Sequence, residues 1–160
     1  MTRAKTLAKT LTWHTKSFGS LSNSELYSML RLRSEVFVVE QDCVYLDLDN
    51  YDQKAHHLIA LDAESEVLCC ARIVAPGVKY AGASIGRIVT SPSLRGSGKG
   101  KALVREAIDA CCTLYPDAEI TISAQQHLEA FYAAFEFKTA SPPYLEDGIP
   151  HIQMTRDARS

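Results

Sequence analysis

The pattern of apolar and polar positions along the chain predicts alternating strands and helices. Apolar residues recur at helical spacing over residues 101–114 and predict an amphipathic helix there. Ser22 and Glu25 match a capping box, so we expect an earlier helix to start here and to run to about Phe37. A third, short helix is expected over residues 128–135. Alternating or continuous apolar runs predict strands over residues 11–18, 55–61, 66–74, 84–90, 119–123 and 151–155.

The resulting order, β-α-β-β-β-α-β-α-β, predicts an α+β fold with a mixed, mostly antiparallel twisted sheet flanked by helices. A length of 160 residues with an apolar fraction of 46% suits one domain with its own core, which we expect to span residues 11–160. Residues 1–10 carry basic side chains but no apolar core. We therefore expect a disordered tail there and not a secretory signal.

Charge and hydropathy exclude several classes of protein. A net charge of −2 gives no reason to expect a nucleic-acid partner, which would call for a basic patch. No apolar run is long enough for a membrane span. The five cysteines are an odd number, and Cys69 and Cys70 should point to opposite faces of a strand, so they cannot bind one metal ion together. We expect reduced, buried cysteines in a cytoplasmic protein with no metal, nucleic acid or membrane partner. A homodimer is left open.

A glycine-rich turn between the expected strand at 84–90 and the helix at 101–114 is the clearest candidate for chemistry. The turn, RGSGKGK at residues 95–101, combines cationic side chains with the free N–H groups of a helix start, which favours a phosphate or pyrophosphate ligand. A P-loop is excluded because Ala102 stands where a Mg²⁺-binding hydroxyl is required. A dinucleotide fingerprint fits poorly because its third glycine falls one residue early.

A third pattern fits this turn better. The spacing Arg95-x-x-Gly98-x-Gly100 resembles the signature with which the GNAT N-acetyltransferases hold the pyrophosphate of acetyl-CoA. Pro92 lies three residues before Arg95, as in the common form of that signature, and Thr90 replaces its usual valine.

Other segments extend the resemblance. Residues 128–137 resemble the family helix that ends in F-Y-x-x-F-G-F, with Glu136 in place of the glycine, a departure that concerns a left-handed cap and not the chemistry. Three further segments resemble the ElaA-like branch of the family, at residues 32–41, 124–128 and 144–152. The likeness covers residues 12–156.

The resemblance implies the GNAT fold and transfer of an acetyl group from acetyl-CoA, the cosubstrate, to an amine. The strand backbone would pair with the pantetheine arm, the glycine turn would hold the pyrophosphate, and Tyr132 would be the general acid beside the CoA sulfur. The expected CoA-binding residues are Ile88, Val89, Thr90, Arg95, Gly96, Ser97, Gly98, Lys99, Gly100, Lys101, Gln125 and Tyr132. Alternatively, Gln125 is a polar residue at a helix start and Tyr132 fills the core between two phenylalanines.

The acceptor side carries no motif of comparable clarity. Candidates for a general base are Glu40, His57 and His151, of which Glu40 follows an apolar run and could instead pair with Arg31 or Arg33. A structural role is the expected one for His57. Residues expected at the acceptor pocket are Gln41, Tyr45, Glu146 and Asp147. The acidic loop with Asp47, Asp49 and Asp52 either attracts a cationic amine or is an ordinary solvated loop.

No nucleophile motif is present, so direct transfer within a ternary complex is the predicted mechanism. Two alternatives remain. One is an acyltransferase like the acyl-homoserine-lactone synthases, to which residues 36–38 are loosely similar. The other is a non-catalytic module that binds acetyl-CoA for regulation. The sequence does not name the acceptor amine.

Overall fold

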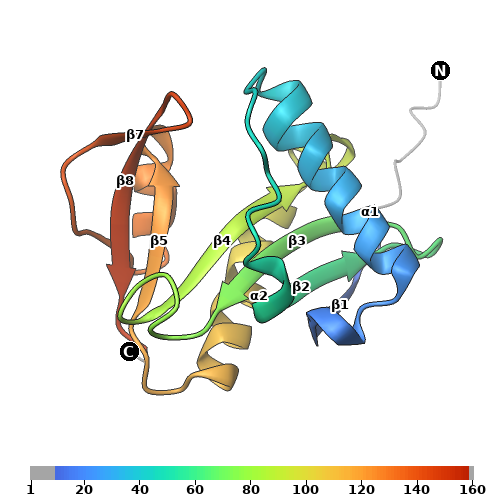
Figure 1. The fold of residues 1–160 in the computed structure, drawn as a ribbon, viewed down its shortest axis with the longest axis horizontal. Helices are drawn as coiled ribbons and strands as arrows, with labels where there is room; N and C mark the ends of the chain where they lie inside the picture. Colours follow the sequence, from blue (N-terminus) through green and yellow to red (C-terminus); the bar gives the residue numbers. More distant parts are fainter. Residues whose placement is uncertain (1–9, 159–160) are drawn as a thin grey trace, which may run out of the picture.

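The computed structural model describes residues 10–158, so nearly all of the expected N-terminal tail lies outside the described residues (Figure 1). The helices are α1 (Asn23–Arg33), α2 (Lys99–Leu114) and α3 (Glu129–Ala133). The strands are β1 (Thr12–Ser17), β2 (His56–Leu61), β3 (Val67–Val74), β4 (Ala83–Thr90), β5 (Ile120–Gln125), β6 (Lys138–Thr139), β7 (Tyr144–Glu146) and β8 (Ile149–Arg156).

The strands form one sheet in the order β1-β2-β3-β4-β5-β8-β6, with β7 also paired to β8. Every pair is antiparallel except β4 with β5, which confirms the predicted mixed, mostly antiparallel sheet. All expected helices and strands are present, but β6 and β7 were not predicted. Both are short and mostly exposed, so they carry no apolar pattern that a sequence could display.

Helices cover both faces of the sheet (Figure 1). Leu58 of β2 packs in the core that includes Leu103 of α2, whereas the next residue, Ile59, packs in a second core with Met29 of α1. The adjacent Cys69 and Cys70 divide between the two cores in the same way, as predicted from strand geometry. All five cysteines are free.

The first helix begins as predicted and ends differently. Ser22 accepts a hydrogen bond from the Glu25 backbone N–H at 3.0 Å, and the Glu25 carboxylate accepts one from the Ser22 N–H at 2.9 Å, which completes the capping box. The regular helix stops at Arg33 and continues as a π-helical segment, η2 (Ser34–Glu40). The wider π turn changes the direction of the side chains that follow it.

Strand β4 has a bulge opposite β3 and separates from β5 on its other edge. Cys70 pairs with Val89 and Arg72 pairs with Gly86, so one residue of β3 faces two of β4, and Arg87 takes a φ of 48°. On its other edge β4 pairs with β5 only at Ala83 and Ser84, and no later β4 residue pairs with β5 in the described chain. The backbone edge of β4 beyond Ser84 is therefore open to a ligand.

Two further observations concern the described residues. Within residues 10–158 no helix has the length and apolar character needed to cross a membrane. Over the same range, no three or more His, Cys, Asp or Glu side chains are grouped so that they could hold a metal ion.

Candidate active site

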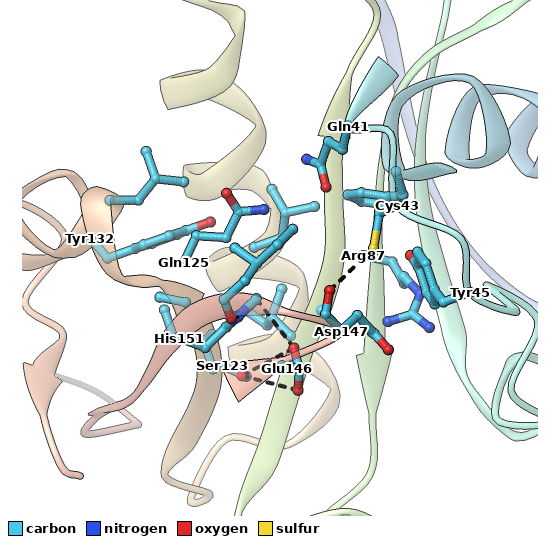
Figure 2. A pocket seen from close by; sticks show the side chains of 18 residues that line it. Gln41, Cys43, Tyr45, Arg87, Ser123, Gln125, Tyr132, Glu146, Asp147 and His151 are labelled. Carbon is cyan, nitrogen blue, oxygen red and sulfur yellow. Dashed lines mark hydrogen bonds and ion pairs between the residues drawn. The ribbon is translucent and has the colours of Figure 1, made fainter. Parts of the chain in front are cut away.

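A cleft of about 140 Å³ opens where β4 diverges from β5 (Figure 2). Segments that are far apart in the sequence contribute to it, among them the loop after η2, the β4 bulge, β5, α3 and the β7–β8 hairpin. Its polar lining consists of Gln41, Cys43, Tyr45, Arg87, Ser123, Gln125, Tyr132, Glu146, Asp147 and His151. We call this space the cleft.

Most of the residues predicted for the acceptor side do meet in the cleft. Those that line it are Gln41, Tyr45, Glu146, Asp147 and His151, together with Ile88, Gln125 and Tyr132 from the predicted CoA-binding set. Val89 and Thr90 continue along β4 outside this lining, and the glycine turn lies beyond the end of the strand. Glu40 is not part of the lining.

Tyr132 belongs both to the core and to the cleft. It is 7% exposed and packs edge-on against Phe131 and Phe137, with ring centroids 5.1 and 6.1 Å away. Burial raises the pKa of Tyr132 to about 12, so the phenol stays protonated at neutral pH. Its ring thus has the packing role given as one alternative, and because the residue also lines the cleft, its role as general acid stays a prediction.

His151 and Glu146 form a pair in the cleft. His151 Nδ1 lies 2.7 Å from the Ile149 carbonyl oxygen, and because a carbonyl only accepts hydrogen bonds, Nδ1 carries the proton. Nε2, the other ring nitrogen, lies 3.3 Å from Glu146 Oε2. The imidazole is buried, with 8% exposure.

Two hydroxyl groups hold this pair in place. Ser123 Oγ lies 3.4 Å from both carboxylate oxygens of Glu146 and also contacts the hydroxyl of Tyr144. The Tyr144 ring stacks on His151 with 6.3 Å between centroids and 25° between planes. Tyr144 can therefore donate to Ser123 while Ser123 donates to Glu146. Figure 2 shows the contacts of Glu146 with Ser123 and His151, which keep the carboxylate aimed at the imidazole.

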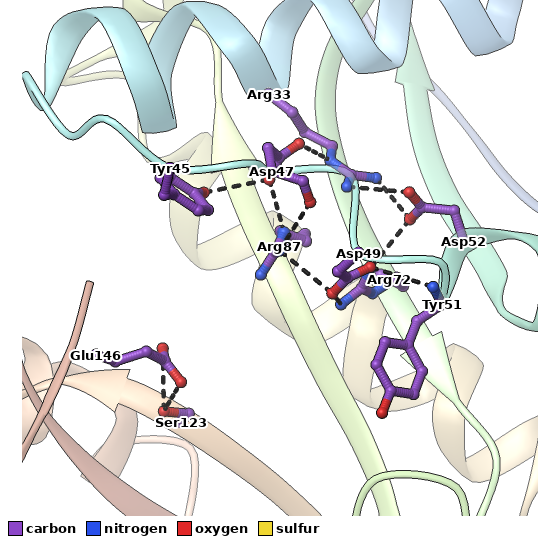
Figure 3. A network of polar contacts seen from close by, with 10 residues as sticks. All are labelled: Arg33, Tyr45, Asp47, Asp49, Tyr51, Asp52, Arg72, Arg87, Ser123 and Glu146. Carbon is purple, nitrogen blue, oxygen red and sulfur yellow. Dashed lines mark hydrogen bonds and ion pairs between the residues drawn. The ribbon is translucent and has the colours of Figure 1, made fainter.

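Ion pairs link the acidic loop to the floor of the cleft (Figure 3). The members of this network are Arg33, Arg72, Arg87, Asp47, Asp49 and Asp52. Arg33 contacts Asp47 at 2.9 Å and Asp52 at 2.8 Å. Arg72 contacts Asp49 at 2.7 Å and Asp52 at 3.1 Å. Arg87 contacts Asp47 at 2.7 Å and Asp49 at 3.3 Å, so positive and negative charges balance within the network.

The expectation of a solvated acidic loop is therefore wrong. Asp47 and Asp52 are buried, with 6% and 5% exposure. Burial opposes the ionisation of Asp52, but the hydrogen bonds and charges of Arg33 and Arg72 outweigh it and hold the pKa of Asp52 below its usual value. His57, whose Nε2 lies 2.9 Å from the Asp52 carbonyl oxygen, is 1% exposed and has the structural role expected for it.

Glu40 pairs with the glycine turn. Its carboxylate forms an ion pair with Arg95, and both side chains are partly exposed. The alternative partners predicted for it, Arg31 and Arg33, are not used, since Arg33 is committed to Asp47 and Asp52. Glu40 thus lies apart from His151, and its role as a general base stays a prediction.

The glycine turn has the backbone expected of an anion site. Gly96 and Gly98 take φ values of 77° and 78°, and Gly98 caps the N-terminus of α2 with no side-chain hydrogen bond. The first N–H groups of α2 consequently have no capping partner and are available to an anion. A Cβ at either glycine would meet no atom within 4 Å, so it is the positive φ and not crowding within the protein that favours glycine here.

Among the polar residues of the cleft, sequence reasoning missed three: Arg87, Ser123 and Cys43. Only Arg87 has a signal in the sequence, because Gly86 inside an apolar strand is typical of a bulge. Ser123 and Cys43 stand in segments whose pattern gives no indication that they meet the cleft.

Comparison with known proteins supports one family. The family described as acetyltransferase (GNAT) domain matches residues 21–158. A UPF0039 protein of Synechocystis sp. is 40% identical over 144 residues, which cover 90% of this chain and 94% of that protein. An acyl-CoA N-acyltransferase from Pseudomonas aeruginosa has a TM-score of 0.88 at 40% identity, covering 92% of this chain and 99% of that structure. ElaA from Escherichia coli has a TM-score of 0.86 at 36% identity, covering 92% and 100%.

More distant structures share the fold alone. A CoA-dependent acyl-homoserine lactone synthase, BjaI, has a TM-score of 0.76 at 17% identity, covering 94% of this chain and 84% of that structure. With a family match across most of its length and relatives that include ElaA, this chain belongs to the GNAT acyltransferases, which depend on acyl-CoA, and within them to the ElaA-like branch.

Proposed function

We propose that this protein is an N-acetyltransferase that moves an acetyl group from acetyl-CoA directly to an amine while both are bound. The observation that carries the proposal is the splay of β4 from β5, which opens onto a cleft lined by Tyr132, His151 and Glu146. An open strand edge, a buried phenol and an imidazole with a free nitrogen are the parts that acetyl transfer requires.

The donor would lie along β4. We assign the backbone of Ile88, Val89 and Thr90 to the amides of the pantetheine arm, since this stretch has no β5 partner. One of its N–H groups would polarise the thioester oxygen, a contribution typically worth about 3 kcal/mol. Gln125 lines the cleft at the end of β5 and would bond the same arm. The remaining predicted residues, Arg95–Lys101, would hold the pyrophosphate.

His151 fits the base better than the other candidates. An amine is mostly protonated at neutral pH and must lose a proton before it attacks a carbonyl carbon. Glu146 attracts the ammonium group, and Nε2 of His151 accepts a proton because Nδ1 already donates to the Ile149 carbonyl. Glu40, through its contact with Arg95, positions the pyrophosphate turn in this scheme.

Tyr132 supplies the other proton. When the amine nitrogen bonds to the carbonyl carbon, the carbon–sulfur bond breaks and its electron pair leaves on sulfur. The phenol, kept protonated by burial, donates to that thiolate, and the nitrogen gives up its second proton, which restores the phenol through water. His151 releases the first amine proton to solvent. The products are the acetylated amine and CoA with a free thiol, so no oxidant or further reactant is needed.

The size of the cleft favours a short acyl group. A volume of about 140 Å³ has to receive the end of the donor and the reacting part of the acceptor. A long acyl chain of the kind used by acyl-homoserine-lactone synthases would require a deeper tunnel. Gln41, Tyr45 and Asp147 also line the cleft, and we assign them to the acceptor.

The proposal is tested by following CoA release with acetyl-CoA and a panel of amines that includes amino acids, polyamines, aminoglycosides and peptide N-termini. We expect an acetylated product, confirmed by mass, from at least one class. The His151→Gln variant should lose roughly 100-fold in kcat/KM and flatten the pH profile while its affinity for acetyl-CoA is unchanged.

His127, an exposed residue outside the cleft, provides the matched control as His127→Gln, which should behave like the parent protein. Tight CoA binding without turnover of any amine would instead identify a non-catalytic module. Faster turnover with long-chain acyl-CoA than with acetyl-CoA would favour the acyl-homoserine-lactone alternative.

A further inference from the structure

A smaller cavity of about 80 Å³ adjoins the cleft. The two spaces share Ile85, Gly86, Arg87, Ser123 and Glu146 in their linings. Neither Tyr132 nor Gln125 lines the smaller cavity, so it extends away from the expected position of the thioester. We call it the second chamber. Its volume is several times the roughly 10–15 Å³ that one water molecule needs, so a small polar group fits in it.

Lys79 supplies a positive charge to the second chamber and forms no direct ion pair among the described residues. The residue is exposed, its ammonium group lies 5.1 Å from the centre of the Tyr51 ring, and no carboxylate of the described residues lies within ion-pair distance. Partial desolvation of the ammonium group and the nearby charge of Arg72 lower the pKa of Lys79 from its ordinary value, while Asp49 and Glu146 oppose this shift. An anion placed beside this ammonium group would favour its charged form and so raise the pKa of Lys79 again.

Arg72 adds an unused hydrogen-bond donor. The residue lines the second chamber and is 2% exposed, and its Nε–H group has no acceptor among the described residues. Its other nitrogens are bound to Asp49 and Asp52 within a network whose charges already balance. Lys79 is therefore the cation of this chamber that forms no ion pair among the described residues, and Arg72 contributes a donor within pairs that already balance.

Glu146 provides the opposite charge at the junction of the two spaces. It lines both of them, and its carboxylate contacts His151 at 3.3 Å. Figure 3 shows Glu146 and Ser123 on the other side of β4 from the arginine network. An ammonium group drawn to Glu146 would thus lie beside the proposed base, while the rest of the molecule would extend toward Lys79.

We propose that the second chamber binds the carboxylate of the acceptor, so that the acceptor is a small amino acid held between Lys79 and Glu146. This inference rests on the proposed acetyltransferase function. One cation without an ion pair matches the one negative charge of a carboxylate, whereas a phosphate monoester carries about −1.5 to −2 at neutral pH. A polyamine would place a second ammonium group against Lys79 and be repelled.

The test compares acceptors that differ only at the carboxylate. We would measure kcat/KM for several amino acids, their carboxamides and the corresponding decarboxylated amines, with the parent protein, Lys79→Met and Lys54→Met. Lys54 is the matched control, because its ammonium group also lies over the Tyr51 ring, at 5.6 Å, yet it does not line the second chamber.

We expect Lys79→Met to lower kcat/KM for amino acids roughly tenfold or more relative to their carboxamides. Lys54→Met should leave that ratio unchanged, and neither substitution should alter the affinity for acetyl-CoA. An unchanged ratio in Lys79→Met, or turnover of polyamines in preference to amino acids, would overturn the inference while leaving acetyl transfer intact.

A binding measurement separates the two proposals if no amine is acetylated. Saturation-transfer NMR with CoA and each amino acid would report binding that is lost in Lys79→Met and kept in Lys54→Met. That result would sustain the second chamber and reject catalysis. Failure of amino acids to bind the parent protein would reject the second chamber.

Discussion

At the proposed donor end of the site, the groups that a ligand would meet are backbone N–H groups of the β4 edge and of the turn at residues 95–101. At the acceptor end they are side chains from segments far apart in the sequence, such as Tyr45, Lys79, Glu146 and His151. The donor end thus depends on local conformation, whereas the acceptor end depends on how distant segments are fixed. A substitution at the donor end should therefore weaken CoA binding, whereas one in the network behind the acceptor end should lower the stability of the protein.

The largest effect is expected from the ion-pair network that fixes the acceptor end. Asp52→Asn removes a buried charge shared by Arg33 and Arg72 and should lower the free energy of unfolding by about 3–5 kcal/mol, as measured by urea denaturation. Lys16→Gln, which breaks the partly exposed pair with Glu25, is the control and should cost less than about 1 kcal/mol. Equal costs for the two substitutions would show that the network does not hold this region.

The same network predicts how the stability of the protein depends on pH. The pKa of Asp52 is lower in the folded protein than its value of about 3.9 in an unfolded chain, so its contribution is complete above that value. The contribution is lost as pH falls through the unfolded pKa toward the folded one. The parent protein should therefore lose stability more steeply on acidification than Asp52→Asn, and parallel acid titrations would contradict the assignment.

A substitution in the glycine turn should weaken CoA binding without disturbing the acceptor end. Gly98→Val strains a backbone with φ 78° and crowds a phosphate, so the Kd for CoA measured by calorimetry should rise roughly tenfold or more. Gly77→Val meets the same strain at φ 81° in a distant turn and should reduce stability without weakening CoA binding. Similar CoA affinity in both variants would reject the pyrophosphate assignment.

Tyr132 lies where the two ends meet. Tyr132→Phe keeps the ring contacts with Phe131 and Phe137 and removes only the hydroxyl. Turnover should fall about 10- to 100-fold with little change in stability or acetyl-CoA affinity, as determined by steady-state kinetics under conditions where chemistry limits the rate. Unchanged turnover would leave Tyr132 with its packing role alone.

The smallest effect concerns the cap after α3. Glu136 stands where the family has glycine and adopts the left-handed conformation all the same, with a φ of 69°. Glu136→Gly should raise the free energy of unfolding by about 0.5–1 kcal/mol, seen as a higher Tm, because it relieves that strain. The gain is reduced by loss of the exposed contact with Arg156, and Glu136→Ala, which keeps the strain, should not stabilise the protein.

Patterns of neighbouring residues were sufficient to predict the long helices and strands and the glycine turn at residues 95–101. The apolar period predicted α2 and the six long strands, the capping box predicted the start of α1, and the glycine spacing predicted the turn before α2. Each of these features depends on neighbouring residues, through backbone conformation or the period of a helix or strand. The two short strands β6 and β7 were not predicted, because their residues are mostly exposed and have no such period.

The acceptor end could not be derived in the same way. The sequence determined that His151 and Glu146 were candidates, but only the tertiary structure placed them 3.3 Å apart. It also paired Glu40 with Arg95 and buried Asp47 and Asp52. Long-range charge pairing decides such an arrangement, because the partner that offsets the desolvation of a buried carboxylate stands far away in the chain. The sequence thus determined the elements and the donor turn, whereas the packing of distant elements determined the charges that face the acceptor.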